Sequence, residues 1–240
     1  MNSRPRQALL LAAGLGTRLK PLTDRIPKCL VPIGGRPLLE HWLSRLASGG
    51  VESFVINTHY FADQVETFCR SSPWAHQIRL VHEPELLGTA GTLRANADCF
   101  SGSGPFVLAH ADNLSIFNLD DFSGAHAKRP NECIGTMMTF LTDRPKDCGI
   151  LIIDDAGVVQ RVYEKVENPP GNLANAAVFI LDDAVVDWVV AQPAATDFCR
   201  DVVPPLAGRW FTFFNDVYHR DIGTPEALAR AESDRPWTKQ

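Results

Sequence analysis

The chain has 240 residues, of which 45% are hydrophobic and 21% are charged, so it can bury a full core. This length fits one α/β domain and would also permit two. The formal net charge of −5 argues against nucleic acid or an anionic membrane as the main partner, although a local basic patch would still bind a small anion.

The cysteines and the start of the chain indicate where the protein works. The six cysteines lie far apart and form no C-x-x-C pair or zinc-like cluster. We see no secretory leader, and the apolar runs are shorter than the roughly 18 residues that span a bilayer. We therefore expect reduced thiols in a cytoplasmic protein that has no membrane partner.

Short β-rich apolar runs alternate along the chain with amphipathic stretches. The pattern predicts strands over residues 8–13, 53–57, 78–82, 105–110, 133–141, 149–153, 158–165, 175–181 and 210–214. It predicts helices over residues 37–48, 61–69, 91–99, 120–127, 182–191, 196–206 and 225–233. This alternation is typical of a Rossmann-like α/β/α fold, with helices on both faces of a mixed, mostly parallel sheet. We expect one domain over residues 1–240, with loose polar ends at 1–7 and 235–240.

The stretch LLAAGLGTRLKPLTDRIPKCLVP, residues 10–32, follows the first predicted strand. Open α/β sheets bind ligands at the carboxyl ends of their strands. Gly14 and Gly16 would let the backbone turn and point N–H groups at an anion, while Arg18 and Lys28 add positive charge. The spacing is that of neither a P-loop nor a dinucleotide fingerprint. The alternative is a plain glycine turn with solvated basic residues.

Two aspartates lie next to the ends of predicted elements later in the chain. Asp112 lies just past the strand at 105–110, and Asp221 lies shortly before the helix at 225–233. Two carboxylates suit Mg²⁺, which keeps several waters and also binds substrate phosphates. Taken alone, each aspartate is equally typical of a helix cap or a turn.

Two further segments carry polar and glycine residues beside predicted strands. EPELLGTAGTL, residues 83–93, has Gly88 at a helix start, where a backbone could approach a ring closely or simply enter the helix. VYEKVENPPGNLANAAVF includes Glu164, Lys165 and Asn175, which could converge on hydroxyls and a phosphate or form an ordinary charged strand edge.

LAAGLGTRLKPLT followed by PKCLVPIGGRPLLEHWL resembles the signature of the sugar-1-phosphate nucleotidyltransferases, the NDP-sugar pyrophosphorylases. The resemblance implies an NTP site made by Leu11, Ala12, Gly14, Gly16, Thr17, Arg18, Glu83, Gly88 and Thr89. It implies a sugar-phosphate site made by Asn113, Gly149, Glu164, Lys165 and Asn175. It assigns Mg²⁺ to Asp112 and Asp221, and catalysis to these two aspartates with Arg18 and Lys28. The chain departs from the family pattern at Cys29, His110 and Ala177.

The implied reaction is attack by a sugar-1-phosphate oxygen on the α-phosphorus of an NTP, with pyrophosphate leaving and no protein nucleophile. The closing FFNDVYHRDIGTPEALARA resembles most the short enzymes that act on mannose- or heptose-1-phosphate, which favours GTP. Uridylyl transfer to an N-acetylmuramate-type sugar is the nearest alternative, followed by thymidylyl or cytidylyl transfer. The sequence leaves open whether the protein is a monomer or a homodimer.

Two other classes of protein fit the sequence less well. A regulatory subunit that binds an NDP-sugar without turnover would be free to lose Lys28, Asp112, Lys165 or Asp221, and all four are present. A dinucleotide-dependent oxidoreductase is disfavoured because the first loop lacks the third glycine of that fingerprint.

Overall fold

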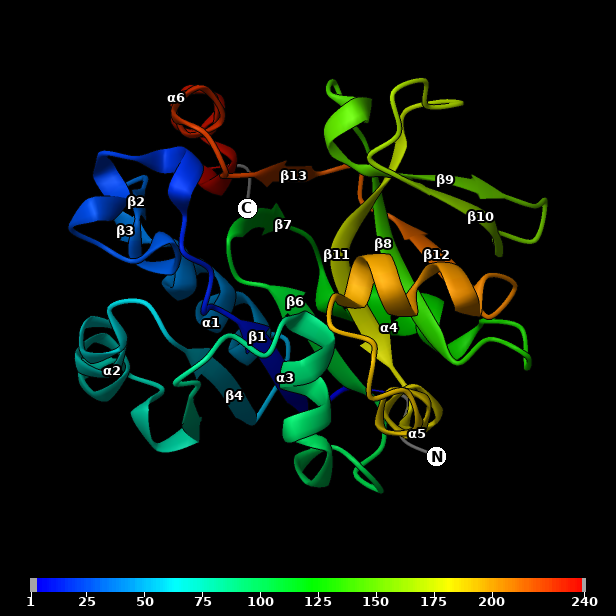
Figure 1. The fold of residues 1–240 in the computed structure, drawn as a ribbon, viewed down its shortest axis with the longest axis horizontal. Helices are drawn as coiled ribbons and strands as arrows, with labels where there is room; N and C mark the ends of the chain where they lie inside the picture. The colour runs from blue at the N-terminus through cyan, green and yellow to red at the C-terminus, as the bar shows by residue number, and fades with distance from the viewer. Residues whose placement is uncertain (1–3, 239–240) are drawn as a thin grey trace. The chain divides into compact units, whose positions relative to one another are not determined.

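A computed structural model describes residues 4–238 of the chain, which divide into two compact units (Figure 1). The first contains residues 6–86, 109–119 and 217–238 and holds the glycine-rich loop, so we call it the loop unit. The second contains residues 4–5, 87–108 and 120–216 and is called the sheet unit because it holds most of the antiparallel strands.

Three parallel strands form the centre of the loop unit. They are β1 (Gln7–Leu11), β4 (Ser53–Thr58) and β5 (Ile78–His82), in the order β1-β4-β5. Residues 8–11 and 54–58 are buried, as expected for parallel strands that are covered on both faces. Helix α1 (Leu38–Ser48) buries its leucines and Trp42, while α2 (Ala62–Ser71) packs next to β5. These elements confirm the predicted pattern to within a few residues at each end.

Two short antiparallel ribbons in the loop unit were not predicted. One pairs β2 (Pro32–Ile33) with β3 (Arg36–Pro37), and the other pairs β7 (Asn113–Ile116) with β13 (Tyr218–Asp221). Residues of the ribbons and of α6 (Pro225–Asp234) contribute to one small apolar cluster, which is made by Ile33, Leu38, Leu114, Ile116, Ile222 and Ala231. Four-residue strands carry too little periodicity to be recognised in a sequence.

The sheet unit is built around β11 (Leu173–Leu181). This strand is antiparallel to β8 (Gly135–Leu141) and β9 (Gly149–Ile153), and β9 pairs in turn with β10 (Val159–Glu164). Strand β12 (Trp210–Phe214) lies parallel to β8. Of strand β6 (Phe106–His110), residues 106–108 belong to the sheet unit and residues 109–110 to the loop unit. The helices are α3 (Thr89–Ala95), α4 (Leu119–Ala127) and α5 (Asp183–Ala191).

The prediction of one α-helix over residues 196–206 was wrong. The structure has a π-helical turn at Phe198–Val202 followed by a 3-10 turn at Pro204–Leu206. The Asp201 carboxylate accepts hydrogen bonds from the backbone N–H groups of Thr196 and Asp197, which holds the entry as a turn. Pro204 and Pro205 then lack the amides that a continuing α-helix needs.

The expectation of loose chain ends was also wrong where the ends are described. Gln7 is the first residue of β1, and Pro5 is buried. At the other end, residues 236–238 form a 3-10 turn, and Trp237 packs against the apolar cluster of the loop unit. Residues 1–3 and 239–240 lie outside the described part. Apolar anchors near each terminus therefore hold more of the chain than its polar composition suggested.

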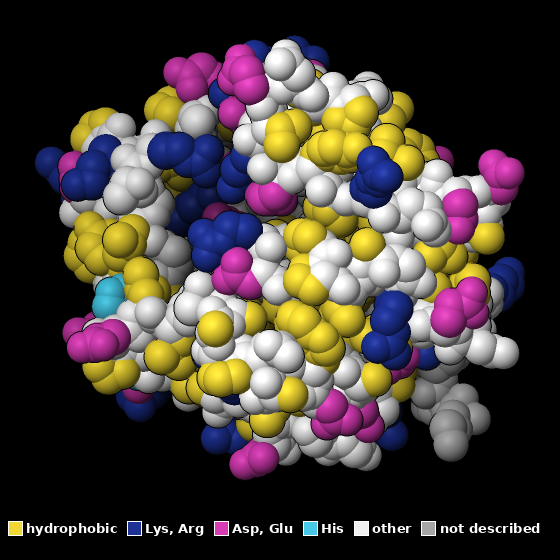
Figure 2. Space-filling model, turned by 45° about the vertical axis from the view of Figure 1, so that its right-hand side comes forward, with side chains coloured by type: hydrophobic (Ala, Val, Ile, Leu, Met, Phe, Trp, Pro, Cys, Tyr) yellow, Lys and Arg dark blue, Asp and Glu magenta, His cyan; other side chains and the backbone are white. Residues whose placement is uncertain are grey.

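The surface mixes apolar and charged side chains. Figure 2 shows hydrophobic side chains scattered among Lys, Arg, Asp and Glu on the face that it presents. Such scattering is normal, because apolar atoms contribute more than half of a folded protein's surface. Within residues 4–238, every helix is too short or too polar to span a bilayer.

Strand β11 contains a strained backbone position. Ala177 has φ +53°, in the left-handed region, where the pairing of β11 with β8 shifts register between Asn175 and Phe179. The Asn175 side-chain oxygen accepts a hydrogen bond from the Ala177 N–H at 2.8 Å and supports this bulge. A left-handed conformation costs an alanine roughly 1–2 kcal/mol that glycine does not incur.

We expect Ala177→Gly to raise the free energy of unfolding by about 0.5–1 kcal/mol, because removal of the strain outweighs the extra freedom of glycine in the unfolded chain. Ala176→Gly is the matched control. Its backbone φ is not positive, and it should lower the free energy of unfolding by about 0.5–1 kcal/mol or more. Urea denaturation measures both, and equal losses for the two variants would contradict this interpretation of the bulge.

Candidate active site

A chain of buried hydrogen bonds fixes the start of the glycine-rich loop. The Ala12 N–H donates to Asn57 Oδ1 at 2.7 Å, and Asn57 Nδ2 donates to Glu83 Oε1 at 3.0 Å. Asn57 and Glu83 are buried at the carboxyl ends of β4 and β5, and Leu11 accepts from the Ala111 N–H. Glu83 therefore supports the loop through Asn57. Asn57 was not predicted as a site residue, although an amide at the end of an apolar strand was a visible signal.

Gly14 and Gly16 differ in their surroundings. Gly16 has φ +64°, and a Cβ there would lie 2.9 Å from Thr23 Cγ2 and 3.1 Å from Lys28 Cβ. The Thr23 hydroxyl donates to the Gly16 carbonyl at 2.7 Å and closes the turn. A Cβ at Gly14 would meet no atom within 4 Å. Gly16 is thus required by the fold of the loop, whereas Gly14 borders open space.

Lys28 joins the two predicted metal-binding carboxylates. Its side chain is 5% exposed, and Nζ lies 2.7 Å from Asp112 Oδ2 and 3.1 Å from Asp221 Oδ1. Arg18 reaches the other oxygen of Asp221, with 3.3 Å between Nη2 and Oδ2. Asp112 follows β6 and Asp221 ends β13, so the fold brings together three segments that are distant in sequence.

The charges of this cluster stabilise one another. Burial disfavours the charged ammonium of Lys28, but the two carboxylates and their hydrogen bonds outweigh it and raise the Lys28 pKa above its ordinary value. Burial likewise opposes the Asp112 carboxylate, yet Lys28 with a smaller effect of His110 holds the Asp112 pKa below its usual range. At neutral pH the Lys28 ammonium and the Asp112 carboxylate are therefore both charged.

The neighbours of Asp221 leave little room. A Cβ at Gly223 would lie 2.7 Å from Arg18 Nη2 and 2.8 Å from Asp221 Oδ2, so a glycine lets Arg18 approach. Asn113 pairs with Asp221 across β7 and β13, and its carbonyl accepts from Trp42 Nε1 at 2.8 Å. Gly223 was likewise not predicted as a site residue, although it lies two residues after Asp221.

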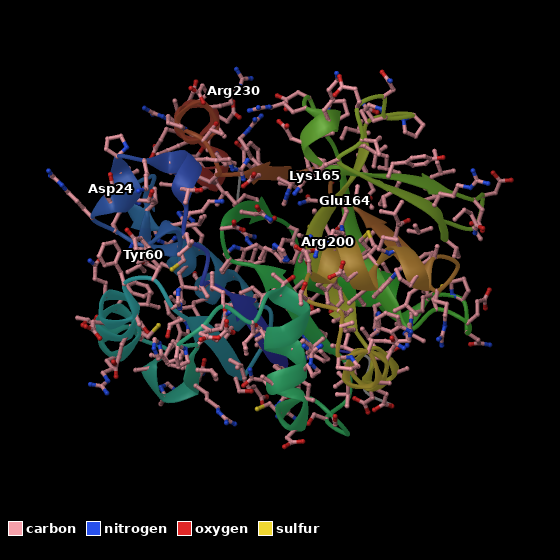
Figure 3. All side chains as sticks on the ribbon, in the orientation of Figure 1. Asp24, Tyr60, Glu164, Lys165, Arg200 and Arg230 are labelled. Carbon is pink, nitrogen blue, oxygen red and sulfur yellow. The ribbon has the colours of Figure 1, made fainter. Side chains whose placement is uncertain are left out.

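In the sheet unit, Gly149 and Glu164 face each other across β9 and β10. A Cβ at Gly149 would clash with Glu164 Oε2, so the glycine makes room for this carboxylate. Lys165 Nζ lies 3.6 Å from Glu164 Oε1, and burial raises the Glu164 pKa despite Lys165. Figure 3 shows Arg200 close to Glu164 and Lys165. Arg200 was missed because it lies in the segment that was predicted to be an ordinary helix.

Gly88, Thr89 and Asn175 make contacts within the sheet unit that the fold itself requires. Gly88 has φ +74°, and a Cβ there would clash with the Thr196 carbonyl. Thr89 Oγ1 accepts from the Phe198 N–H at 2.7 Å. Asn175 Nδ2 lies 3.5 Å from Cys199 Sγ, in hydrogen-bonding contact.

The structure therefore groups the predicted site residues in two sets. The loop unit holds Leu11, Ala12, Gly14, Gly16, Thr17, Arg18, Lys28, Glu83, Asp112, Asn113 and Asp221. The sheet unit holds Gly88, Thr89, Gly149, Glu164, Lys165 and Asn175. Their roles in substrate binding stay predictions.

The candidate metal site consists of two carboxylates and is not a complete set of protein ligands. Nowhere between residues 4 and 238 do three or more His, Cys, Asp or Glu side chains gather as a complete metal site. Asp112 and Asp221 nevertheless direct an oxygen each at one cation, the Lys28 ammonium. Two converging carboxylates fit Mg²⁺, whose remaining ligands are usually waters and substrate phosphates.

A glycine-rich loop after a parallel strand, with a pair of carboxylates nearby, is an arrangement typical of nucleotide-binding α/β proteins. The family model described as nucleotidyl transferase matches residues 7–236, which include residues of both units. The chain belongs to the nucleotidyl transferase family.

Individual relatives agree with this family. The chain is 31% identical to a mannose-1-phosphate guanylyltransferase of Mycobacterium tuberculosis, over 95% of this chain and 64% of that protein. It is 30% identical to the mannose-1-phosphate guanyltransferase beta-B of Xenopus laevis, over 92% and 62%. It thus spans less than two thirds of the length of these relatives.

The fold has solved counterparts. HddC from Yersinia pseudotuberculosis complexed with GMP-PN superposes with a TM-score of 0.77, at 24% identity, over 96% of this chain and 99% of that one. This likeness confirms the predicted fold class, a mostly parallel mixed sheet with helices on both sides.

We expect Gly16→Ala to lower the free energy of unfolding by about 1–3 kcal/mol, because the new Cβ meets Thr23 and the backbone is left-handed. Gly14→Ala is the matched control and should change stability by less than about 1 kcal/mol, since nothing obstructs its Cβ. Chemical denaturation of both variants measures the difference. A Gly16→Ala variant as stable as Gly14→Ala would show that Gly16 is not required by the loop.

Proposed function

We propose that this chain transfers a nucleotidyl group from an NTP to a sugar-1-phosphate and releases pyrophosphate, and that both units act as one nucleotidyltransferase domain. The observation that carries the proposal is the convergence of Lys28, Asp112 and Asp221 beside the glycine-rich loop, in a chain of the nucleotidyl transferase family.

The loop unit would bind the NTP. Gly14 and Gly16 would present backbone N–H groups to the phosphates, with Arg18 exposed beside them. Lys28 would serve the phosphate that is transferred. Asp112 and Asp221 would hold Mg²⁺, which when bound would neutralise phosphate charge. Catalysis would rest on alignment and cations, as phosphoryl transfer does in general.

The sheet unit would bind the sugar phosphate. Lys165 is exposed and would pair with the phosphate, while Glu164, held against Gly149, would accept hydrogen bonds from sugar hydroxyls. Asn175 would add an amide donor. A sugar-1-phosphate oxygen would then attack the α-phosphorus in line with the departing pyrophosphate.

GTP with mannose- or heptose-1-phosphate is the proposed substrate pair. The names of the relatives from Mycobacterium tuberculosis and Xenopus laevis support guanylyl transfer to mannose-1-phosphate. UTP with an N-acetylmuramate-type sugar, and a regulatory subunit that binds an NDP-sugar without turnover, are the remaining alternatives. A cytoplasmic location stays a prediction from the sequence.

The test is a screen of five common NTPs against a panel of sugar-1-phosphates, with pyrophosphate release as the readout and Mg²⁺ present. We expect release with GTP and mannose- or heptose-1-phosphate, and a severe loss in the Asp112→Asn variant. Release with UTP only would overturn the base assignment. Binding of an NDP-sugar without any release would support the regulatory alternative.

Lys165→Ala should raise the KM for the sugar-1-phosphate by about ten- to a hundredfold, because a charge-assisted contact is lost, with little effect on the KM for the NTP. Lys146→Ala is the matched control. Lys146 is an exposed lysine of the same unit that pairs with Glu167, and its variant should leave both KM values unchanged. A Lys165→Ala variant that weakens only NTP binding would refute the assignment.

A further inference from the structure

We propose that Lys28 is an internal counter-ion that occupies the place of the divalent cation in the metal-free protein, and that it must leave Asp112 and Asp221 before a metal ion binds. The inference rests on the proposed function, which assigns the metal to these two carboxylates. It adds a second state of Lys28 that the transfer reaction alone does not require.

Three of the four carboxylate oxygens of this site already have a cationic partner. Lys28 Nζ donates hydrogen bonds to Asp112 Oδ2 and Asp221 Oδ1, and Arg18 donates one to Asp221 Oδ2. Both oxygens of Asp221 therefore have a cationic partner. A metal ion that binds Asp221 must displace at least one of them, and one that bridges both aspartates competes directly with Lys28.

Electrostatics explains why Lys28 takes this place. Two neighbouring carboxylates repel each other, and an unpaired lysine that is 5% exposed would be strongly destabilising. In the metal-free chain, the ion pair that Lys28 shares with both aspartates reduces the carboxylate repulsion and gives the buried ammonium its partners. A divalent cation would also neutralise the carboxylates, but it would repel an ammonium held a few ångströms away. The two cations therefore exclude each other.

The position of the lysine stem shows where the ammonium can go. Lys28 Cβ lies 3.1 Å from the place where a Gly16 Cβ would stand, so the stem packs against the glycine-rich loop. Phosphates bound to this loop would offer the ammonium new partners. Lysine suits such an exchange because it is a point charge on a flexible stem, unlike the rigid fork of arginine.

The test measures Mn²⁺ binding without nucleotide, using the electron paramagnetic resonance signal of free Mn²⁺ in titrations of the whole chain. Lys28→Met should bind Mn²⁺ about tenfold or more tightly than the wild type, because no charge-assisted hydrogen bonds have to be broken. Lys28→Arg keeps the charge and should bind no more tightly than the wild type. Lys20→Met is the control for a lysine of the same segment that pairs with Asp24, and it should match the wild type.

Thermal unfolding gives a second readout. Without metal, Lys28→Met should unfold at a lower temperature than the wild type. Saturating Mn²⁺ should raise the Tm of Lys28→Met by more than it raises the Tm of the wild type. If circular dichroism shows that Lys28→Met does not fold, Lys28→Gln takes its place in both measurements. Mn²⁺ binding by the neutral variant that is equal to or weaker than that of the wild type overturns the inference.

This outcome is separable from a failure of the proposed function. If the wild-type chain releases pyrophosphate with Mg²⁺ while the neutral variant gains no Mn²⁺ affinity, only the counter-ion role of Lys28 is refuted. If no substrate pair gives release, the transferase proposal fails whatever the Mn²⁺ titrations show.

Discussion

The arrangement of the loop unit depends on one buried ammonium. Lys28 is separated by 84 residues from Asp112 and by 193 from Asp221, yet it bonds to both. A buried charge must be paired, and losing its partners typically costs about 3–5 kcal/mol. The segment after β6 and the end of β13 therefore have to reach the glycine-rich loop for the unit to be stable. The same requirement places every charged group of the candidate metal site.

Glycines allow the close approaches around this cluster. Gly16 lets the loop pass over Thr23 and the stem of Lys28, and Gly223 lets Arg18 reach Asp221. Gly14 has no such neighbour, so the packing of the unit does not account for it.

Local periodicity explains which parts of the fold were predictable. The strands at 78–82, 149–153 and 210–214 and the helix at 37–48 are where the sequence pattern placed them, to within a residue. Strands β7 and β13 depend on each other across about a hundred residues, so neither has a signal of its own. The residues of the site depend in the same way on distant partners. In the sequence Asp112 and Asp221 resemble ordinary turn aspartates, and only the folded chain pairs them with Lys28. Asn57 acquires its role only through its contacts with Ala12 and Glu83.

Backbone strain in the sheet unit lies in the segments predicted for the sugar phosphate. Lys165 and Ala177 both have positive φ without being glycine, and such strain persists only where surrounding contacts enforce it. The Lys165 N–H bonds to the Cys148 carbonyl, and the Ala177 N–H bonds to Asn175 Oδ1. That oxygen keeps a second lone pair, so Asn175 still offers an acceptor site as well as its amino group. The bulge at Ala177 thus fixes the orientation of the Asn175 amide, because one lone pair of its oxygen is committed to the backbone.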